Sequence, residues 1–250
     1  MNRQPLRVSV IGIDGAGKSS TTLRAIERLS AEARVCKPGR HAFVQQGGHR
    51  EYCVPRISNG FERFFRRVDA SRRRSLIGLS RIAFIAYQRW LEPYLIGKYR
   101  PSVVISTRCM IIDPSIYCDI YWPRLKRISL GQRIRAFQQF SGVPFRDLYI
   151  FLRTPASVAL ERIHRRVAQT PLLKDQPREY WLHLHESESI LARLGTRFDE
   201  AFAVARTLAD FEVLDVDTTR YDETAVAQII AGEIRGRLST ATSPMVRACV

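Results

Sequence analysis

Short runs of apolar residues recur along the chain and predict buried strands. The first is residues 7–13 (RVSVIGI), a β-branched run bounded by glycine, and similar runs lie at residues 102–106, 148–152 and 212–216. Runs of this kind between turn residues are typical of strands that are covered on both faces. A weaker candidate strand lies at residues 42–46. Together these segments predict a central sheet.

A helical spacing of apolar residues characterises the segments between these runs. Residues 18–32 place Leu23, Ile26 and Leu29 on one helix face, which can pack on the sheet. Strands that alternate with helices favour a mostly parallel sheet that is flanked by helices. Further helices are expected at about residues 60–100, 124–141, 155–166, 178–208 and 223–238.

The length of the chain favours one domain. The sequence has 250 residues and is 45% apolar, which suffices for a single three-layer α/β domain over residues 1–238. Gly47–Gly48 and residues 169–177 are expected to be loops, and residues 239–250 a loosely held C-terminal tail.

One short motif carries specific chemistry. The segment GIDGAGKS at residues 12–19 satisfies the pattern G-x-x-x-x-G-K-S/T between a predicted strand and a predicted helix. Its glycines let the backbone N–H groups turn toward phosphate oxygens, Lys18 reaches the β- and γ-phosphates, and Ser19 offers its hydroxyl to Mg²⁺. We therefore predict a P-loop nucleoside triphosphate hydrolase-type fold that binds ATP and Mg²⁺. The predicted nucleotide-binding residues are Gly12, Asp14, Gly15, Ala16, Gly17, Lys18, Ser19 and Ser20.

The chain is strongly basic, with 40 Lys and Arg residues against 24 Asp and Glu and a formal net charge of +16. Positive charge implies an anionic partner, which is either the phosphates of a small substrate, nucleic acid or an acidic surface. No basic tail or aromatic-spaced RNA-binding signature accompanies the arginines, so a nucleic-acid partner is not favoured. The five cysteines have no CxxC spacing, and we expect free thiols rather than a disulfide framework or a zinc site.

No segment is expected to cross a membrane. The most apolar stretch, residues 76–94, contains Arg81, Arg89, Glu92 and Pro93, which are costly in hydrocarbon. The first ten residues lack the apolar core of a secretory signal, so a cytoplasmic protein without a membrane partner is expected.

A P-loop alone does not separate kinases from GTPases or mechanical ATPases. The chain lacks a late N/T-K-x-D motif, which a GTPase needs to read guanine. Mechanical ATPases usually end a strand in a carboxylate that holds Mg²⁺, whereas Thr107 and Arg153 follow two of the predicted strands here. A phosphotransferase remains, because this class relies on positioning of the acceptor and on arginine side chains.

Four blocks of the sequence, in order, resemble the thymidylate kinase family of nucleoside monophosphate kinases. GIDGAGKSS carries an Asp between the first two glycines of the loop, as that family does. Residues 91–108, 145–166 and 212–230 are similar to its helix-Pro-strand block, its strand and arginine-rich helix, and its last strand and helix. The resemblance implies a kinase of this fold, with a lid at about residues 162–180, and relatives are often homodimers.

The resemblance also implies roles for individual residues. Asp14 would contact the acceptor, at a sugar hydroxyl, and Arg108 would bind the acceptor phosphate. A lid arginine would stabilise the phosphoryl group in transfer, and Arg162, Arg165 and Arg166 are the candidates. A lid arginine becomes more necessary because Ala16 stands where some relatives carry an arginine. The predicted catalytic residues are Lys18, Arg108, Arg162 and Arg166.

Several positions depart from the family pattern. Thr107 and Cys109 replace the Asp and Tyr of the family's Asp-Arg-Tyr motif, and Asp113 is a candidate replacement for the missing carboxylate. Tyr117 keeps the family's tyrosine spacing, but Cys118 stands where relatives have a base-contacting glutamine. The acceptor-side arginine of the preceding helix has two candidates, Arg81 and Arg89.

These observations predict an ATP-dependent phosphotransferase that moves the γ-phosphoryl group to a nucleoside monophosphate. A kinase of the same fold that acts on a nucleoside, a sugar or another small metabolite is the alternative, which the departures at Thr107, Cys109 and Cys118 favour. An alternative of another class is a nucleotide-binding regulator or a nucleic-acid-associated ATPase, which the charge favours.

Overall fold

A seven-stranded sheet forms the centre of the part of the chain that the computed structural model describes, which is residues 4–53, 60, 63–65, 67–68, 71, 73–169 and 186–240. The strands lie in the order β4-β3-β2-β5-β1-β6-β7. β1 pairs in parallel with β5 on one side and with β6 on the other, whereas β3 and β4 form an antiparallel hairpin at one edge. The strands span Leu6–Ile11 (β1), Val35–Lys37 (β2), Phe43–Gln46 (β3), His49–Tyr52 (β4), Val103–Ser106 (β5), Leu148–Arg153 (β6) and Glu212–Asp217 (β7).

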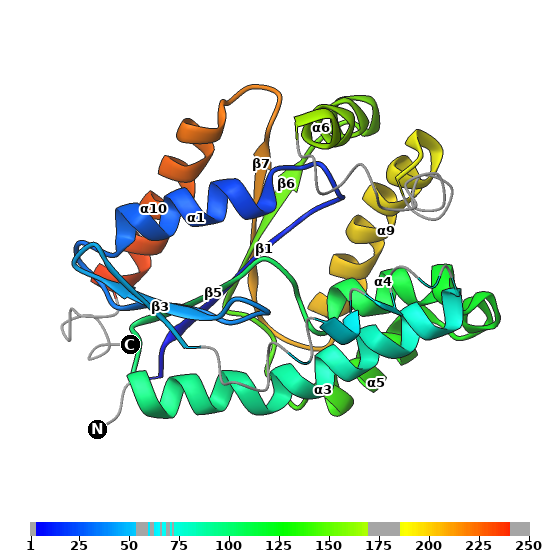
Figure 1. Ribbon diagram of the computed structural model, residues 1–250, viewed down its shortest axis with the longest axis horizontal. Coiled ribbons are helices and arrows are strands. Elements are labelled where there is room, and N and C mark those ends of the chain that lie inside the picture. Colours follow the sequence, from blue (N-terminus) through cyan, green and yellow to red (C-terminus); the bar gives the residue numbers. More distant parts are fainter. Residues whose placement is uncertain are drawn as a thin grey trace, which may run out of the picture.

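Helices cover both faces of the sheet (Figure 1). One face carries α1 and α10, which pack on each other, and the other carries α3, α4, α5 and α9. The α-helices span Lys18–Leu29 (α1), Arg74–Tyr99 (α3), Ile112–Tyr121 (α4), Leu130–Ser141 (α5), Ala156–Gln169 (α6), Glu188–Arg206 (α9) and Glu223–Thr240 (α10), with a 3-10 helix η1 at Pro123–Arg127. The predicted three-layer α/β fold is confirmed.

The central strands are apolar because both of their faces are covered. Val8, Val10 and Ile11 of β1 are fully buried, and all four residues of β5 are buried. This burial explains the apolar runs in the sequence, because strands inside a mostly parallel sheet are covered on both faces. The carboxyl ends of β1, β2, β5, β6 and β7 therefore lie along one edge, which is where ligands bind in folds of this kind.

The predicted strands at residues 7–13, 102–106, 148–152 and 212–216 correspond to β1, β5, β6 and β7, and residues 42–46 to β3. Two strands were not predicted, because β2 has only three residues and β4 (HREY) is largely exposed and polar. The expected loop at Gly47–Gly48 is the turn between β3 and β4, with both glycines at positive φ.

The helical predictions need six corrections. The helix expected at residues 60–100 is interrupted at Ser71 and Arg73, before α3 begins, and the helix expected at residues 178–208 is not helical at Glu186 and Ser187, before α9.

Helix α4 was not predicted, since its sequence IDPSIYCDIY has no clear helical stripe. The single helix expected at residues 124–141 is split into η1 and α5, because Ser129 and Gln132 form a capping box that starts α5. α10 extends through Thr240, two residues into the expected tail. α6 extends to Gln169, the first residue of a loop that we expected over residues 169–177. Residues 170–185 and 241–250 lie outside the described part, and so do most of the expected lid and tail.

Candidate active site

The loop between β1 and α1 is held in a conformation that only glycine allows at two of its positions. Gly15 has φ +84°, and a Cβ atom there would lie 2.3 Å from the carbonyl oxygen of Ala159 in α6. Gly12 has φ +151°, and its Cβ would lie 2.7 Å from the carbonyl oxygen of Leu152 in β6. The loop is therefore packed against β6 and α6, which fixes its path.

The start of α1 is arranged to receive an anion. Gly17 precedes the helix in the left-handed region, with φ 88°, and no side chain caps the first turn. The first turn also contains no acidic residue. The free N–H groups and the positive end of the helix dipole are thus available to a phosphate group.

Lys18 folds back over this loop. Its ammonium group donates hydrogen bonds to the carbonyl oxygens of Gly12 and Ile13, both at 2.8 Å, and lies 3.6 Å from Asp14 Oδ1. Burial lowers the pKa of Lys18, and the carboxylates of Asp14 and Asp113 offset part of that shift. The positive charge of Lys18 is therefore held over the predicted phosphate-binding loop. Its one ion pair, with Asp14, is long, and a phosphate ligand could take the place of Asp14.

A cavity of about 620 Å³ opens above the loop. We call it the donor cavity. Its lining brings together residues from the P-loop, the end of β5, α6 and the segment after β7, which are far apart in the sequence. Every predicted site residue except Gly12 lines it, namely Asp14, Gly15, Ala16, Gly17, Lys18, Ser19, Ser20, Arg108, Arg162 and Arg166.

The three arginines of α6 differ in their surroundings. Arg162 donates to the hydroxyl of Thr218 at 3.0 Å and to the carbonyl oxygen of Thr218 at 2.9 Å, so it is anchored to the end of β7. Arg165 pairs with Glu161 on the exposed side of the helix. Arg166 is exposed and forms no hydrogen bond or ion pair with any residue that the structure describes. Arg166 is therefore the arginine that is free to meet a ligand in the donor cavity.

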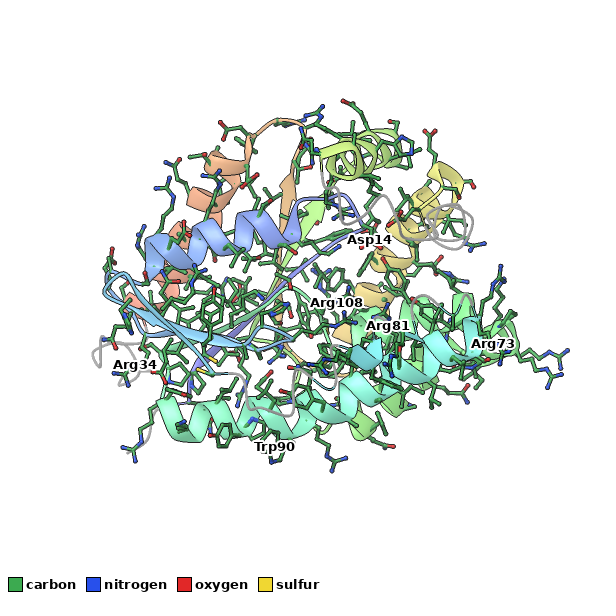
Figure 2. The ribbon with its side chains drawn as sticks, in the orientation of Figure 1. Asp14, Arg34, Arg73, Arg81, Trp90 and Arg108 are labelled. Atoms are coloured by element: carbon green, nitrogen blue, oxygen red, sulfur yellow. The ribbon has the colours of Figure 1, made fainter. Side chains whose placement is uncertain are left out.

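A second cavity of about 390 Å³ adjoins the first, and the two share Ser19, Thr107 and Arg108. We call it the acceptor cavity. Its remaining lining residues come from the ends of β2 and β5, from α3 and from the segment before β6: Lys37, Pro38, Gly39, Arg40, His41, Arg81, Phe84, Gln88, Glu92, Ser106, Met110 and Arg146. Figure 2 shows Arg108 between Asp14 of the P-loop and Arg81 of α3.

Charged groups surround Arg108 at the junction of the cavities. Its side chain is exposed to the solvent of the cavity. Desolvation lowers the pKa of Arg108, but Asp14 and Asp113 outweigh it, so the net shift is upward and the guanidinium stays charged. Asp113 accepts a hydrogen bond from the backbone N–H of Cys109, while its Oδ1 atom is buried without a hydrogen-bond partner. Burial raises the pKa of Asp113 to about 6, and Lys18 and Arg108 act against that rise.

The structure decides between the two candidate arginines of α3. Arg81 lines the acceptor cavity. Arg89 donates to the carbonyl oxygen of Phe140 and lies under Gly142, so it holds the end of α5.

Cys109 and Cys118 form hydrogen bonds inside the protein. Cys109 is buried, and its sulfur accepts hydrogen bonds from the N–H groups of Ile111 and Ile112. Cys118 is buried, and its sulfur accepts from Arg133 at 3.4 Å. Neither cysteine is among the lining residues of the two cavities.

Several acceptor-cavity residues were not found from the sequence. Lys37 and Arg40 flank the dipeptide Pro38–Gly39, and this turn after a very short strand was the only signal for them. Gln88 and Phe84 lie on α3, where they look like ordinary positions of a helix.

None of the helices in the described part is long and apolar enough to cross a membrane. No group of three or more His, Cys, Asp and Glu residues in that part is placed to bind a metal ion.

Comparison with known proteins gives a likeness of fold. No family model and no curated protein matches this chain. Two solved structures of deoxyadenosine kinase from M. mycoides align with it, one with the products dCMP and a flexible dCDP and one with dATP. Each is 18% identical with a TM-score of 0.52, and the alignments cover 92% of this chain and 100% and 99% of the other chains. The chain thus has the fold of P-loop kinases, while the particular resemblance to thymidylate kinases is not confirmed.

Proposed function

We propose that this chain is an ATP-dependent kinase that transfers the γ-phosphoryl group to a small acceptor, with a nucleoside monophosphate as the first candidate. The observation that carries this proposal is the junction of the two cavities at Ser19, Thr107 and Arg108. One cavity is built on a phosphate-binding loop and the other is open to a second ligand. Two ligands in this arrangement would meet at their phosphoryl groups, which is what in-line transfer requires.

Different residues at the junction would stabilise the negative charges of the donor phosphates, the acceptor and the transferring phosphoryl group. The backbone N–H groups of residues 12–19 and the start of α1 would hold the donor phosphates, and Lys18 would exchange its carbonyl contacts for phosphate oxygens. Arg108 would bind the acceptor, with Asp14 close by, and Arg166 would approach the transferring group from α6.

The site fits a magnesium ion that enters with the triphosphate. The hydroxyl-bearing side chain of Ser19 is exposed at the mouth of both cavities, and Mg²⁺ prefers oxygen ligands while it keeps several waters and substrate phosphates. When bound, the ion would neutralise charge on the β- and γ-phosphates. Ser19 is the residue of this chain that we propose as its ligand.

A hydroxyl acceptor, such as a nucleoside, a sugar or another metabolite, is the second candidate. Its support is Asp113, which interacts with Lys18 and Arg108 although it is not among the lining residues of either cavity. Its unpaired oxygen and pKa of about 6 suit a group that accepts a proton near neutral pH. The aligned solved structures also belong to enzymes that are named for a nucleoside.

The test has two stages. Calorimetry with MgATP measures whether the P-loop binds a nucleotide, and we expect saturable binding that disappears without Mg²⁺ or in Lys18→Ala. Phosphotransfer from labelled ATP is then measured across nucleoside monophosphates, nucleosides, sugars and sugar phosphates. Binding of MgATP without transfer to any acceptor, together with salt-sensitive retention of DNA or RNA, would favour a nucleic-acid-associated ATPase instead. The predicted homodimer and cytoplasmic location stay predictions, and sedimentation and fractionation test them.

A further inference from the structure

The acceptor cavity carries more positive charge than its own residues neutralise. Four arginines and one lysine line it, and Glu92 is the only carboxylate among the lining residues that the structure describes. Glu92 is already bound by Arg146, with contacts of 2.6 Å and 2.8 Å to its two oxygens, and Arg7 lies 3.7 Å away. Glu92 is therefore neutralised inside the protein and is not available as a base or as a partner for the other cations.

Lys37 is a cation of this cavity whose charge has no partner among the described residues. It ends β2, which pairs in parallel with β5, so its place on the sheet edge is next to the strand that leads to Arg108. Lys37 forms no hydrogen bond or ion pair with any residue in the described ranges, and its ammonium lies 5.8 Å from the ring centroid of Phe43. Burial and the nearby Arg50 lower the pKa of Lys37, and Cys36 offsets only part of this effect. A partly buried ammonium group in such surroundings is stabilised by an anion from outside the protein.

Arg40 is positioned beside Lys37 by the turn at Pro38–Gly39. Its guanidinium lies 4.5 Å from the ring centroid of Phe65 and 6.0 Å from that of Phe84. Contacts with two aromatic rings hold the side chain in the cavity wall. The loop after β2 therefore presents two cations to the same cavity.

Gln88 supplies an independent sign of a ligand. Its side chain is 3% exposed and lines the cavity, yet its amide Nε2 group is buried without a hydrogen-bond partner. A buried donor without a partner costs free energy unless a ligand provides an acceptor. Together with Phe84 and Met110 it forms a less charged part of the cavity, which suits the ring of an organic acceptor.

We infer that Lys37, supported by Arg40, binds an ionised phosphate group of the acceptor and makes this cavity select phosphomonoesters over neutral alcohols. A phosphomonoester carries a charge of about −1.5 to −2 at pH 7, so it would satisfy Lys37 and Arg108 together. A neutral alcohol would leave the ammonium of Lys37 unsatisfied. The inference rests on the proposed kinase function and names the substrate class of the same site.

The transfer step needs no general base when the phosphate group of the acceptor is ionised. An acceptor phosphate oxygen forms a bond to the γ-phosphorus of ATP, and the bond from that phosphorus to the β-γ bridging oxygen breaks. The bridging oxygen keeps the electron pair and leaves as part of ADP. No proton has to be removed, which matches a cavity in which Glu92, the one carboxylate among the described lining residues, is already paired with Arg146.

The experiment compares matched pairs of acceptors in matched variants. Calorimetry with wild type, Lys37→Gln, Lys37→Arg and Lys126→Gln measures binding of nucleosides and their 5′-monophosphates, and of ribose and ribose 5-phosphate, with a non-hydrolysable MgATP analogue present. Lys126 is an exposed residue of η1 that lines neither cavity, so Lys126→Gln controls for a simple loss of charge.

We expect wild type to bind at least one monophosphate roughly tenfold or more tightly than its neutral partner. Lys37→Gln should weaken that binding by roughly 10- to 100-fold, the loss of one charge-assisted hydrogen bond, and leave the neutral partner and the ATP analogue unaffected. Lys37→Arg should retain most of the preference, and Lys126→Gln all of it. The nucleotide and sugar arms identify which phosphomonoester is bound.

The inference is overturned if wild type prefers the neutral acceptors, or if Lys37→Gln weakens both members of a pair equally or neither of them. If Lys37→Gln does not fold, Arg40→Gln is tested in its place. An unchanged preference for monophosphates over neutral acceptors in Arg40→Gln would then contradict the proposed role of Lys37 and Arg40. Absence of binding of the ATP analogue counts against the proposed kinase function, while titration of the acceptors alone still tests the cavity. Phosphotransfer to alcohols alone would contradict the inferred preference for phosphomonoesters, but it would agree with the proposed kinase function.

Discussion

The donor and acceptor cavities meet at the same residues but are built in different ways. The donor cavity is organised by one continuous loop, whose glycines Gly12 and Gly15 lie close to β6 and α6. The acceptor cavity is lined by side chains from β2, α3, β5 and the segment before β6. Backbone donors recognise a phosphate whatever it is attached to, whereas a set of side chains can be altered residue by residue. In the proposed kinase, the first cavity would therefore define the chemistry, and the second would define the substrate.

The strongest test of the donor cavity is Lys18→Ala. We expect phosphotransfer to fall by roughly 10³-fold or more, because Lys18 is the positive charge held over the phosphate-binding loop. The fold should be kept, since the contacts of the lysine ammonium, to the carbonyl oxygens of Gly12 and Ile13 and to Asp14, are all within the loop itself. Steady-state kinetics and thermal unfolding measure the two effects. Full activity in a folded variant would remove the loop from the mechanism.

The next test separates the arginines of α6. Arg166→Ala should lower kcat by roughly 10²- to 10³-fold with an unchanged melting temperature, because Arg166 has no described partner to lose. Arg162→Ala should instead lower the melting temperature, since two hydrogen bonds to Thr218 are lost. The reverse pattern would assign the catalytic role to Arg162.

Arg108→Ala tests the junction from the acceptor side. We expect the KM for the acceptor to rise by roughly 10- to 100-fold while the Kd for MgATP changes little. The reason is that Arg108 lines the acceptor cavity as well as the donor cavity, whereas residues 14–18 of the P-loop line the donor cavity and not the acceptor cavity. Initial-rate kinetics with each substrate varied in turn give the comparison. Equal losses for the two substrates would place Arg108 on the donor phosphates.

Asp113 gives the smallest expected effect and sharpens the choice of acceptor. Its pKa in the folded protein is raised from 3.8 to about 6, so the folded state binds this proton more tightly than the unfolded state. The stabilisation from the bound proton is present at low pH and is lost as the pH rises through about 6. Asp113→Asn should therefore be more stable than wild type at pH 7.5, by on the order of 2 kcal/mol, with the difference shrinking below pH 5.

Urea unfolding of the ligand-free protein at several pH values measures this difference, and parallel curves for the two proteins would contradict it. The same variant has a kinetic readout. If the acceptor is an alcohol, kcat/KM in wild type should rise as the pH passes 6, and Asp113→Asn should abolish that rise. An ionised phosphate acceptor predicts little effect of the substitution on kcat.

The parts of the fold that were predicted from the sequence are those with a strong local signal. The buried strands β1, β5 and β6 are largely apolar, because each lies between two covered faces. β7 is the edge strand and is only partly buried, but its sequence still contains apolar residues. The helix α4 and the strands β2 and β4 were not predicted, since they are short or polar and are stabilised by their neighbours. Cys118 stands where the family that the sequence resembles has a base-contacting glutamine, and only the structure shows that its sulfur accepts a hydrogen bond from Arg133 inside the protein.

By itself the sequence determined the phosphate-binding loop, because all of its working parts lie within residues 12–19 and depend on backbone conformations that glycine alone permits. Only the tertiary structure decided which distant side chains share the acceptor cavity, that Arg81 rather than Arg89 faces it, and that Lys37 faces it without a partner of its own among the described residues. The physical reason is that a loop is specified by neighbours in the chain, whereas a cavity of side chains is specified by how strands and helices pack, and no local pattern records that packing.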